Sequence, residues 1–300
     1  MSLPKGTYSA AITRFAPSPT GLLHLGHAVA AVAAHNLASQ TGGEFLLRID
    51  DIDAGRCRPQ FEAAIYEDLT WLGFDWPEPV RRQSDCLAEY EAALQRLRAL
   101  GVIYPCFCTR KEILAEAARA QGAPHGADGP LYPGTCRALV PDEIRARMQT
   151  GAIAALRLDS AKACGLGDMP LIFEEHGEGP EGEQGEILAR PALLGDIVVA
   201  RSGTAGVAGY SYHLAVVVDD AAQKISWVTR GRDLFFATHV QRLLQALLDL
   251  PVPQYLHHAL AVDEAGKRLA KRHDALSLRD FRERGVSVAE VLAMVRAVLR

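Results

Sequence analysis

The chain has 300 residues, 49% of them hydrophobic, which is enough to bury a substantial core in one large domain or in one domain with an insertion. A net charge of −4 argues against a broad nucleic-acid-binding surface, because such a surface usually shows as a basic excess. The six cysteines do not indicate a disulfide scaffold, and no segment reads as a signal peptide or a membrane span, so we expect a cytoplasmic protein without a membrane partner.

The first hundred residues alternate between strand-like and helix-like segments. Residues 12–15 and 44–49 read as buried strands, and the alanine-rich residues 25–40 between them read as a helix that stops at a glycine pair. Two more helices are expected, one over residues 59–73 and one that starts at Ser84 as its N-cap. This alternation favours a parallel α/β sheet, so the segment is predicted to form half of a nucleotide-binding fold.

The middle of the chain has a different pattern. Residues 121–130 and the acidic, glycine-rich residues 174–186 read as exposed or poorly ordered loops. Residues 152–158, 196–201 and 210–218 are strand-like, and the glycines between the last two suit a hairpin. The middle is therefore predicted to be an insertion that interrupts the parallel sheet.

The alternation resumes after Ser226. A helix over residues 233–250 and a strand over residues 256–262 are expected, and Ser287 with Glu290 forms a capping box that opens a last helix. The sequence L-A-V-V-V-D-D at residues 214–220 is like the metal-binding strand of a P-loop ATPase. No G-x-x-x-x-G-K-[ST] motif accompanies it, so that interpretation fails.

The loop after the first strand reads R-F-A-P-S-P-T-G-L-L-H-L-G-H at residues 14–27. Backbone N–H groups at a helix N-terminus attract phosphate, and Gly21 and Gly26 let the backbone approach a ligand closely. His24 and His27 can donate hydrogen bonds to phosphate oxygens that gain charge during attack on an α-phosphate. The alternative is a tight turn with two incidental histidines, but the whole block is far more specific than H-x-G-H alone.

A second, cationic segment reads K-R-L-A-K-R at residues 267–272. Lysine is a compact, mobile charge that can follow phosphates through a transition state. Together with Arg279, Arg282 and Arg284, this segment is also a candidate tRNA contact, with a solvated charged face as the alternative.

Three cysteines, Cys106, Cys108 and Cys136, can form a closed tetrahedral zinc site with a fourth donor. Tyr132 and His125 are the candidate fourth donors, and the pattern alone favours the histidine because phenolate is an unusual zinc ligand. Ordinary small buried cysteines are the alternative.

The block at residues 14–27 and the cationic segment resemble the two ATP signatures of class I aminoacyl-tRNA synthetases, His-Ile-Gly-His and Lys-Met-Ser-Lys-Ser. With L-R-I-D-D-I-D at residues 47–53, the resemblance narrows to the glutamate branch and runs from about residue 10 to residue 276. The chain is most similar to the glutamyl-queuosine tRNA(Asp) synthetases, short paralogues of glutamyl-tRNA synthetase, and is expected to lack an anticodon-binding domain.

The resemblance implies an α/β fold: a Rossmann-like class I synthetase catalytic domain, a zinc-containing connective insertion and a short C-terminal helical part. The two halves of the catalytic domain are expected at residues 1–103 and 196–262, with the insertion at residues 104–195 between them. Residues 263–300 are expected to hold the cationic ATP loop and a helical tail.

The resemblance also implies a reaction. Glutamate attacks the α-phosphate of ATP, which Mg²⁺ accompanies, and forms glutamyl-adenylate. The glutamyl group then passes to queuosine at the wobble position of tRNA(Asp). The expected partners are ATP, L-glutamate and tRNA(Asp) carrying queuosine, and the protein is expected to be a monomer with one structural Zn²⁺.

Matching positions assign roles to individual residues. The ATP site would comprise Pro17, Gly21, His24, Gly26, His27 and Lys271, of which the two histidines and the lysine would be catalytic. The glutamate site would comprise Arg14, Ser18, Asp50, Tyr212 and Arg230. The family binds zinc through C-x-C and a following Y-x-x-x-C, so the ligands would be Cys106, Cys108, Tyr132 and Cys136 rather than His125.

Some positions depart from the family pattern. Asp50 stands where glutamate is usual, His213 where asparagine is usual and Ala270 where serine is usual. Two other functions therefore stay open: a truncated glutamyl-tRNA synthetase that charges a tRNA 3′ end, and a catalytically silent tRNA- or protein-binding paralogue.

Overall fold

The computed structural model of the protein describes residues 9–119, 125–126, 129–166, 170–203, 206–261 and 276–299. The cationic segment with Lys271 and Ala270 lies outside these residues, as do much of the expected loop at residues 121–130 and the side chain of His125. The predicted division of the chain into domains stays a prediction.

A three-stranded parallel sheet forms from the first predicted alternation, in the order β1-β2-β3. The first helix starts at His24 as its N-cap and ends before Gly42, whose φ of 64° suits a residue without a Cβ. The first two strands and first two helices thus confirm the sequence prediction. The elements are β1 (Ile12–Phe15), α1 (Leu25–Thr41), β2 (Glu44–Ile49), α2 (Pro59–Trp71), β3 (Arg81–Arg82) and α3 (Leu87–Ala99).

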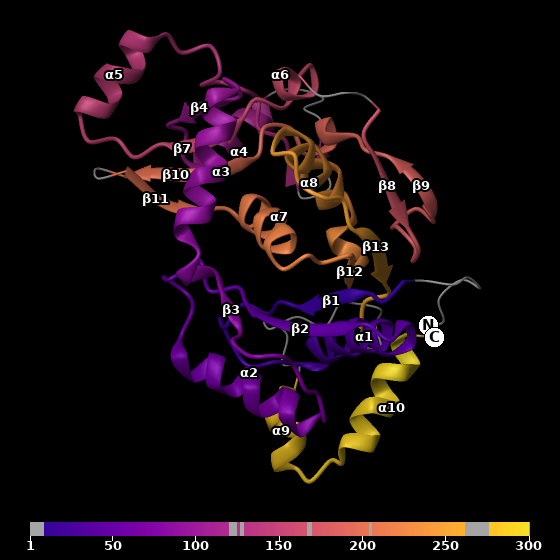
Figure 1. Ribbon diagram of the computed structural model, residues 1–300. Coiled ribbons are helices and arrows are strands. Elements are labelled where there is room, and N and C mark those ends of the chain that lie inside the picture. Colours follow the sequence, from indigo (N-terminus) through magenta and orange to yellow (C-terminus); the bar gives the residue numbers. More distant parts are fainter. Residues whose placement is uncertain are drawn as a thin grey trace.

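A second sheet, in the order β12-β13-β8-β9, lies directly beside the first. Ser226 joins them: its N–H donates to the carbonyl oxygen of Ile12 (3.0 Å), and its hydroxyl accepts from the N–H of the same residue (2.9 Å). Helix α1 packs on one side of the strands, and α7 and α8 lie on the other side (Figure 1). The elements are β8 (Ile172–Glu175), β9 (Gly185–Leu188), α7 (Tyr212–Ala222), β12 (Trp227–Gly231), α8 (Phe235–Leu247) and β13 (Gln254–His258).

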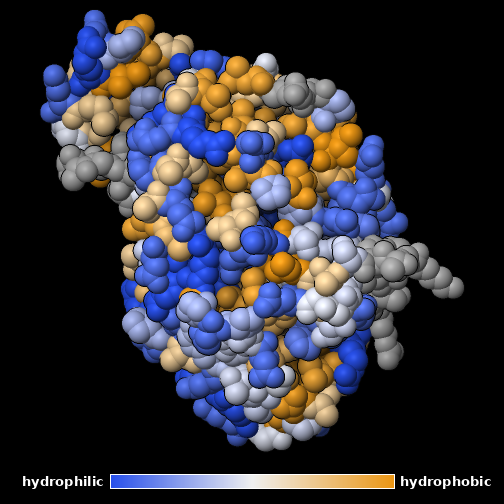
Figure 2. Space-filling model, viewed as in Figure 1, coloured by the Kyte–Doolittle hydropathy of each residue, from blue (hydrophilic) through white to orange (hydrophobic). Residues whose placement is uncertain are grey.

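An antiparallel sheet, the insertion sheet, has the order β11-β10-β7-β4. Its strands β10 and β11 lie after residue 195, so the sheet extends beyond the predicted insertion at residues 104–195. Two of its strands match the predictions at residues 152–158 and 196–201. An antiparallel pair also forms at the glycines, but its second strand is the glycine-containing segment β11 and not residues 210–218. Helix α5 buries none of its residues and projects from the body, where the surface carries polar and apolar residues side by side (Figure 2). The elements are β4 (Ile103–Cys106), α4 (Arg110–Arg119), β5 (His125–Gly126), β6 (Gly129–Pro130), α5 (Pro141–Gln149), β7 (Ala155–Leu158), α6 (Ser160–Cys164), β10 (Val198–Gly203) and β11 (Gly206–Tyr210).

Residues 210–218, predicted as a strand, form most of helix α7 instead. Ser211 caps this helix, and its hydroxyl accepts from the N–H of Leu214 at 3.4 Å. The β-branched run suggested a strand, but the helix is buried on most of its surface, so it shows no clear polar face. Tertiary burial therefore outweighed the local β preference.

The acidic residues 174–186, predicted as an exposed loop, take part in the β8–β9 hairpin, and Glu175 is only 1% exposed.

Ser84 does not cap α3, because its N–H and hydroxyl both donate to Asp51 and the N-cap is Cys86. The strand predicted at residues 256–262 begins and ends earlier in the chain, as β13 (Gln254–His258). The predicted helix at residues 233–250 begins with a 3₁₀ turn before α8.

Two short helices, α9 (Leu278–Glu283) and α10 (Val288–Val298), end the described chain. The capping box of Ser287 and Glu290 is confirmed. The N–H of Leu278 donates to the carbonyl oxygen of Leu23 at 2.7 Å, which holds α9 against the loop before α1. Among the helices of the described ranges, none combines the length and the apolar character that crossing a bilayer requires.

Candidate active site

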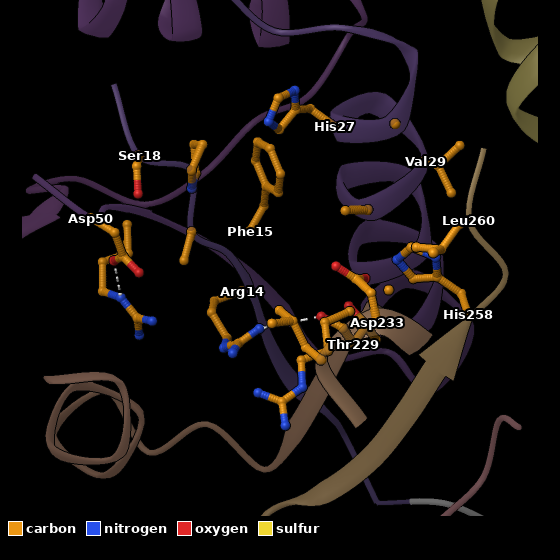
Figure 3. Close-up of a pocket in the computed structure, with 18 of the residues that line it drawn as sticks. Arg14, Phe15, Ser18, His27, Val29, Asp50, Thr229, Asp233, His258 and Leu260 are labelled. Carbon is orange, nitrogen blue, oxygen red and sulfur yellow. Dashed lines mark hydrogen bonds and ion pairs between the residues drawn. The ribbon is translucent and has the colours of Figure 1, made fainter. Parts of the chain in front are cut away.

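A cavity of about 310 Å³ opens at the carboxyl ends of β1, β2, β12 and β13, the edge of a parallel sheet where ligands usually bind. Asp50 and Ser18 lie on one side of it, and His258, Asp233 and Leu260 lie on the other (Figure 3). Gly21 does not line it, and Lys271 lies outside the described residues. The predicted residues that do line it are Arg14, Pro17, Ser18, His24, Gly26, His27, Asp50, Tyr212 and Arg230.

The two predicted catalytic histidines are held by the start of α1. The Nδ1 atom of His24 accepts from the N–H of Gly26, and the Nδ1 atom of His27 accepts from the N–H of His24, both at 3.1 Å. A ring nitrogen that accepts a hydrogen bond carries no proton, so in each neutral ring the proton is on Nε2. Both side chains are therefore N–H donors, and the ring centroids are 3.9 Å apart.

Gly26 is needed for this arrangement. A Cβ at this position would lie 3.0 Å from Cε1 and 3.1 Å from Nδ1 of His24, closer than ordinary packing allows. The N–H of Gly26 is already bonded to the imidazole of His24, so it does not point to a ligand. At this helix N-terminus, the donors that face the cavity therefore come from the histidine rings and not from the N–H group of Gly26.

Arg14 is buried and already paired with a carboxylate. Its Nε and Nη2 atoms donate to the two oxygens of Asp220, at 3.0 and 3.3 Å, and Nη1 donates to the carbonyl oxygen of Thr229 at 3.3 Å. Two of its five N–H groups make no bond to a described residue and could bind a ligand. Its charge is therefore largely compensated within the protein.

Arg48, which sequence reasoning missed, links the carboxylates of one wall. Its Nε donates to Asp50 (2.8 Å), and its Nη1 donates to Asp220 (2.7 Å) and Gln223 (3.1 Å). Burial raises the pKa of Asp50 to about 6, although the charge of Arg48 opposes this shift. Burial would also raise the pKa of Asp220, but Arg14 and Arg48 outweigh it and hold that pKa below its ordinary value.

Asp219, the neighbour of Asp220 on α7, stabilises the same wall through bonds to residues that do not line the cavity. Its carboxylate accepts from Arg81 (2.9 Å), Gln83 (2.9 Å) and Tyr90 (2.8 Å), and all but the arginine are neutral donors. Helix α7 thus connects β1, β2, β3 and α3 through its last two acidic residues.

Arg230 differs from Arg14 and Arg48, the other arginines of the cavity, because every described partner of its guanidinium is neutral. Arg230 is 5% exposed, and the Cζ atom of its guanidinium lies 5.5 Å from the centroid of the Tyr255 ring. One of its five N–H groups has no bond to a described residue. The partners are Nε2 of His257 (3.0 Å), the hydroxyl of Tyr212 (3.3 Å), Oε1 of Gln241 (2.9 Å) and Oγ1 of Thr238 (2.6 Å).

The predicted metal ligands also come together, at the edge of the insertion sheet. The three Sγ atoms of Cys106, Cys108 and Cys136 lie within 4.8 Å of one another, and the Cys108–Cys136 pair is 3.5 Å apart. The hydroxyl of Tyr132 lies 3.7 Å from Sγ of Cys108. Two ligands about 2.3 Å from a tetrahedral zinc ion lie about 3.8 Å apart, so this donor set fits such an ion.

The candidate tRNA contacts near the C-terminus are partly used inside the protein. Arg279 and Arg282 both pair with Glu67 on α2, at 3.2 and 3.3 Å. These ion pairs hold α9 against α2, so the two arginines serve at least a structural purpose.

The model of the tRNA synthetases class I (E and Q) catalytic domain matches residues 10–299. The chain belongs to this family. The mixed α/β architecture is that of a class I synthetase catalytic domain, as the sequence predicted.

Individual members of the class I synthetase family are similar over most of the chain. A Glutamyl-Q tRNA(Asp) synthetase of Rhodobacter capsulatus is 49% identical over 95% of this chain and 99% of its own length. A protein of the same name from Symbiobacterium thermophilum is 42% identical over 93% of this chain and 83% of its own length. A glutamate tRNA ligase of Elizabethkingia meningosepticum, solved in complex with its amino acid, matches with a TM-score of 0.67 and 25% identity, over 92% of this chain and 53% of that one.

Proposed function

We propose that the protein is a ligase that activates L-glutamate with ATP and transfers the glutamyl group to queuosine at the wobble position of tRNA(Asp). The similarity to the Rhodobacter protein along nearly its full length supports this substrate assignment. The observation that carries the proposal is the cavity itself. It joins a buried guanidinium with only neutral partners, a carboxylate and two imidazole donors at a helix N-terminus.

Each group of the cavity suits one part of the substrates. Arg230, with the remaining N–H groups of Arg14, would bind a carboxylate of glutamate, and Asp50 would face its ammonium group. The apolar side chains of Val29 and Leu260, on the far side of the cavity, would accept the adenine ring (Figure 3). The imidazoles of His24 and His27 also line the cavity and would donate to the phosphates.

The first step would be an in-line displacement at phosphorus. An α-carboxylate oxygen of glutamate bonds to the α-phosphorus of ATP, the bond to the bridging oxygen breaks, and pyrophosphate leaves with that electron pair. Charge builds on the phosphate oxygens, where the Nε2–H groups of His24 and His27 stabilise it. Mg²⁺ bound to ATP and Lys271 would neutralise the leaving pyrophosphate.

The second step would transfer the acyl group without a covalent enzyme intermediate. A hydroxyl oxygen of the queuosine cyclopentenediol attacks the carbonyl carbon of glutamyl-adenylate and loses its proton, and AMP leaves. The protein contributes positioning and charge stabilisation to both steps.

We also propose one structural zinc ion, held by Cys106, Cys108, Cys136 and Tyr132. Replacing Cys106, which is 1% exposed, by serine removes one thiolate, so we expect the zinc content to fall from one equivalent per chain to a small fraction. The melting temperature should drop by roughly 5 °C because the insertion loses a cross-link. Metal analysis and thermal unfolding measure these two effects.

Cys164→Ser is the matched control, because Cys164 is a free, half-buried cysteine outside the cluster. This variant should keep its zinc. Full zinc content in Cys106→Ser would remove Cys106 from the ligand set.

The proposed function is tested with ATP, Mg²⁺, labelled glutamate and tRNA(Asp) with and without queuosine. We expect label only on the modified tRNA, and the label should also appear on modified tRNA from which the 3′-terminal adenosine has been removed. Label on tRNA irrespective of queuosine, and lost when that adenosine is removed, would favour the conventional synthetase. An absence of both label and pyrophosphate exchange would favour the silent paralogue.

A further inference from the structure

Glu175 is a buried carboxylate next to the cavity that is not explained by the proposed reaction. It is 1% exposed, at the end of β8, in a segment that reads as an exposed acidic loop from sequence. Its Oε1 accepts from the N–H groups of Gly177 (2.8 Å) and His257 (2.9 Å), and its Oε2 lies 2.5 Å from Nδ1 of His257. A buried carboxylate surrounded by neutral donors is costly, so a role for its charge is expected.

The hydrogen bonds define the protonation state of His257. Nε2 of His257 receives a hydrogen bond from Nε of Arg230, and a guanidinium can only donate. Nε2 therefore carries no proton, and the single ring proton lies on Nδ1 and is donated to Glu175. Burial lowers the pKa of His257 to about 4, and the His257 hydrogen bonds hold the pKa of Glu175 below its ordinary value despite burial, in agreement with a neutral imidazole beside a carboxylate.

The result is a buried line of three side chains on three neighbouring strands: Glu175 on β8, His257 on β13 and Arg230 on β12. The imidazole separates the carboxylate from the guanidinium, so Arg230 has a nearby counter-charge without a direct ion pair. A direct pair, like that of Arg14 with Asp220, would occupy the donors that a substrate carboxylate needs.

We propose that Glu175 and His257 are positioning residues for Arg230: the carboxylate selects the Nδ1–H form of His257, and its Nε2 then orients the guanidinium towards the substrate carboxylate. This inference rests on the proposed function, because it gives Arg230 glutamate as its ligand. Neither positioning residue contacts substrate. Their loss therefore weakens glutamate binding and leaves the ATP site intact.

The test is steady-state ATP–pyrophosphate exchange with Glu175→Gln, His257→Leu and His257→Gln. Glutamine at position 175 removes the charge and places an amide donor beside His257, which favours the Nε2–H form that cannot accept from Arg230. We expect Glu175→Gln and His257→Leu to raise KM for glutamate about tenfold or more, with kcat and KM for ATP within about threefold of the native values. His257→Gln can place an amide oxygen near the position of Nε2 and should recover most of the glutamate affinity.

His239→Gln is the matched control, because His239 is also fully buried but bonds to the N–H of Arg190. It should keep the native KM for glutamate. A merely structural role for Glu175 and His257 would lower the melting temperature of their variants without a selective change in KM for glutamate, and that result would overturn the proposal. If His257→Leu does not fold, a native glutamate KM in Glu175→Gln overturns it equally.

The exchange activity of the native protein distinguishes a failure of the positioning role from a failure of the proposed function. Native protein without glutamate-dependent exchange would contradict the proposed function itself. Active native protein with unchanged glutamate KM in Glu175→Gln would contradict the positioning role alone.

Discussion

Replacing Arg230 by alanine is expected to reduce kcat/KM for glutamate activation by roughly thirtyfold to several thousandfold. Loss of one partner of a buried, hydrogen-bonded charge pair costs about 2–5 kcal/mol, and about 1.4 kcal/mol corresponds to a factor of ten. Arg230 should lie at the upper end of this range, since no carboxylate of the described residues bonds to it and its charge is directed at the ligand. Glutamate-dependent ATP–pyrophosphate exchange measures the effect.

Two further variants define the cause. Arg230→Lys keeps the charge but loses the planar donor fork, so it should recover only part of the activity. Arg242→Ala is the control on the same helix as Gln241, because Arg242 is half-buried and donates only to the carbonyl oxygen of Ile172 (2.9 Å). Near-native activity of Arg230→Ala would exclude Arg230 from glutamate binding.

Local signals in the first fifty residues were sufficient to predict the part of the cavity that holds His24, His27 and Asp50. A strand, a turn rich in proline and glycine, a helix stopped by Gly42 and a second strand are all encoded within short stretches. The positions of His24, His27 and Asp50 follow from these elements alone. No long-range information is needed for this part of the site.

Helix α7 shows where local reasoning fails. Its run of β-branched residues favours a strand, and only the packing of α3 and α8 around it makes a helix the better solution. The same error concealed Asp219 and Asp220, which read as the end of a strand in the sequence. On the helix, Asp220 accepts hydrogen bonds from Arg14 and Arg48, and Asp219 accepts one from Arg81.

Charge partners could not be predicted because they are distant in sequence. Arg14 and Asp220 are 206 positions apart, and Arg48 and Asp220 are 172 positions apart. Glu175 is a similar case: its burial depends on β8 joining β13, which no local pattern in an acidic, glycine-rich segment indicates. Sequence motifs therefore identified residues that line the cavity, and the structure added the residues that hold them.

Glutamate binding is expected to weaken as the pH falls through about 6, because Asp50 must be ionised to bind the substrate ammonium group. Burial raises the pKa of Asp50 to about 6, so this carboxyl is protonated below that pH and charged above it. The affinity should fall about tenfold for each pH unit below 6, until it reaches that of Asp50→Asn. The dissociation constant of glutamate, measured by calorimetry without ATP between pH 5 and pH 8, tests this directly.

Binding without ATP removes the phosphates from the titration, and the comparison with Asp50→Asn separates Asp50 from the cavity-lining histidines, His24, His27 and His258. The phosphates of ATP are absent, and the pKa of His257, about 4, and the lowered pKa values of Asp220 and Glu175 place those groups outside this pH range. Asp50→Asn should bind about 10- to 100-fold more weakly at pH 8 and lose the dependence, whereas Asp50→Glu should bind at least as well as the native protein. An unchanged pH dependence in Asp50→Asn would mean that another group titrates. A large loss of affinity in Asp50→Glu would instead mean that Arg48, 2.8 Å from the shorter carboxylate, holds the acid where the ammonium group needs it.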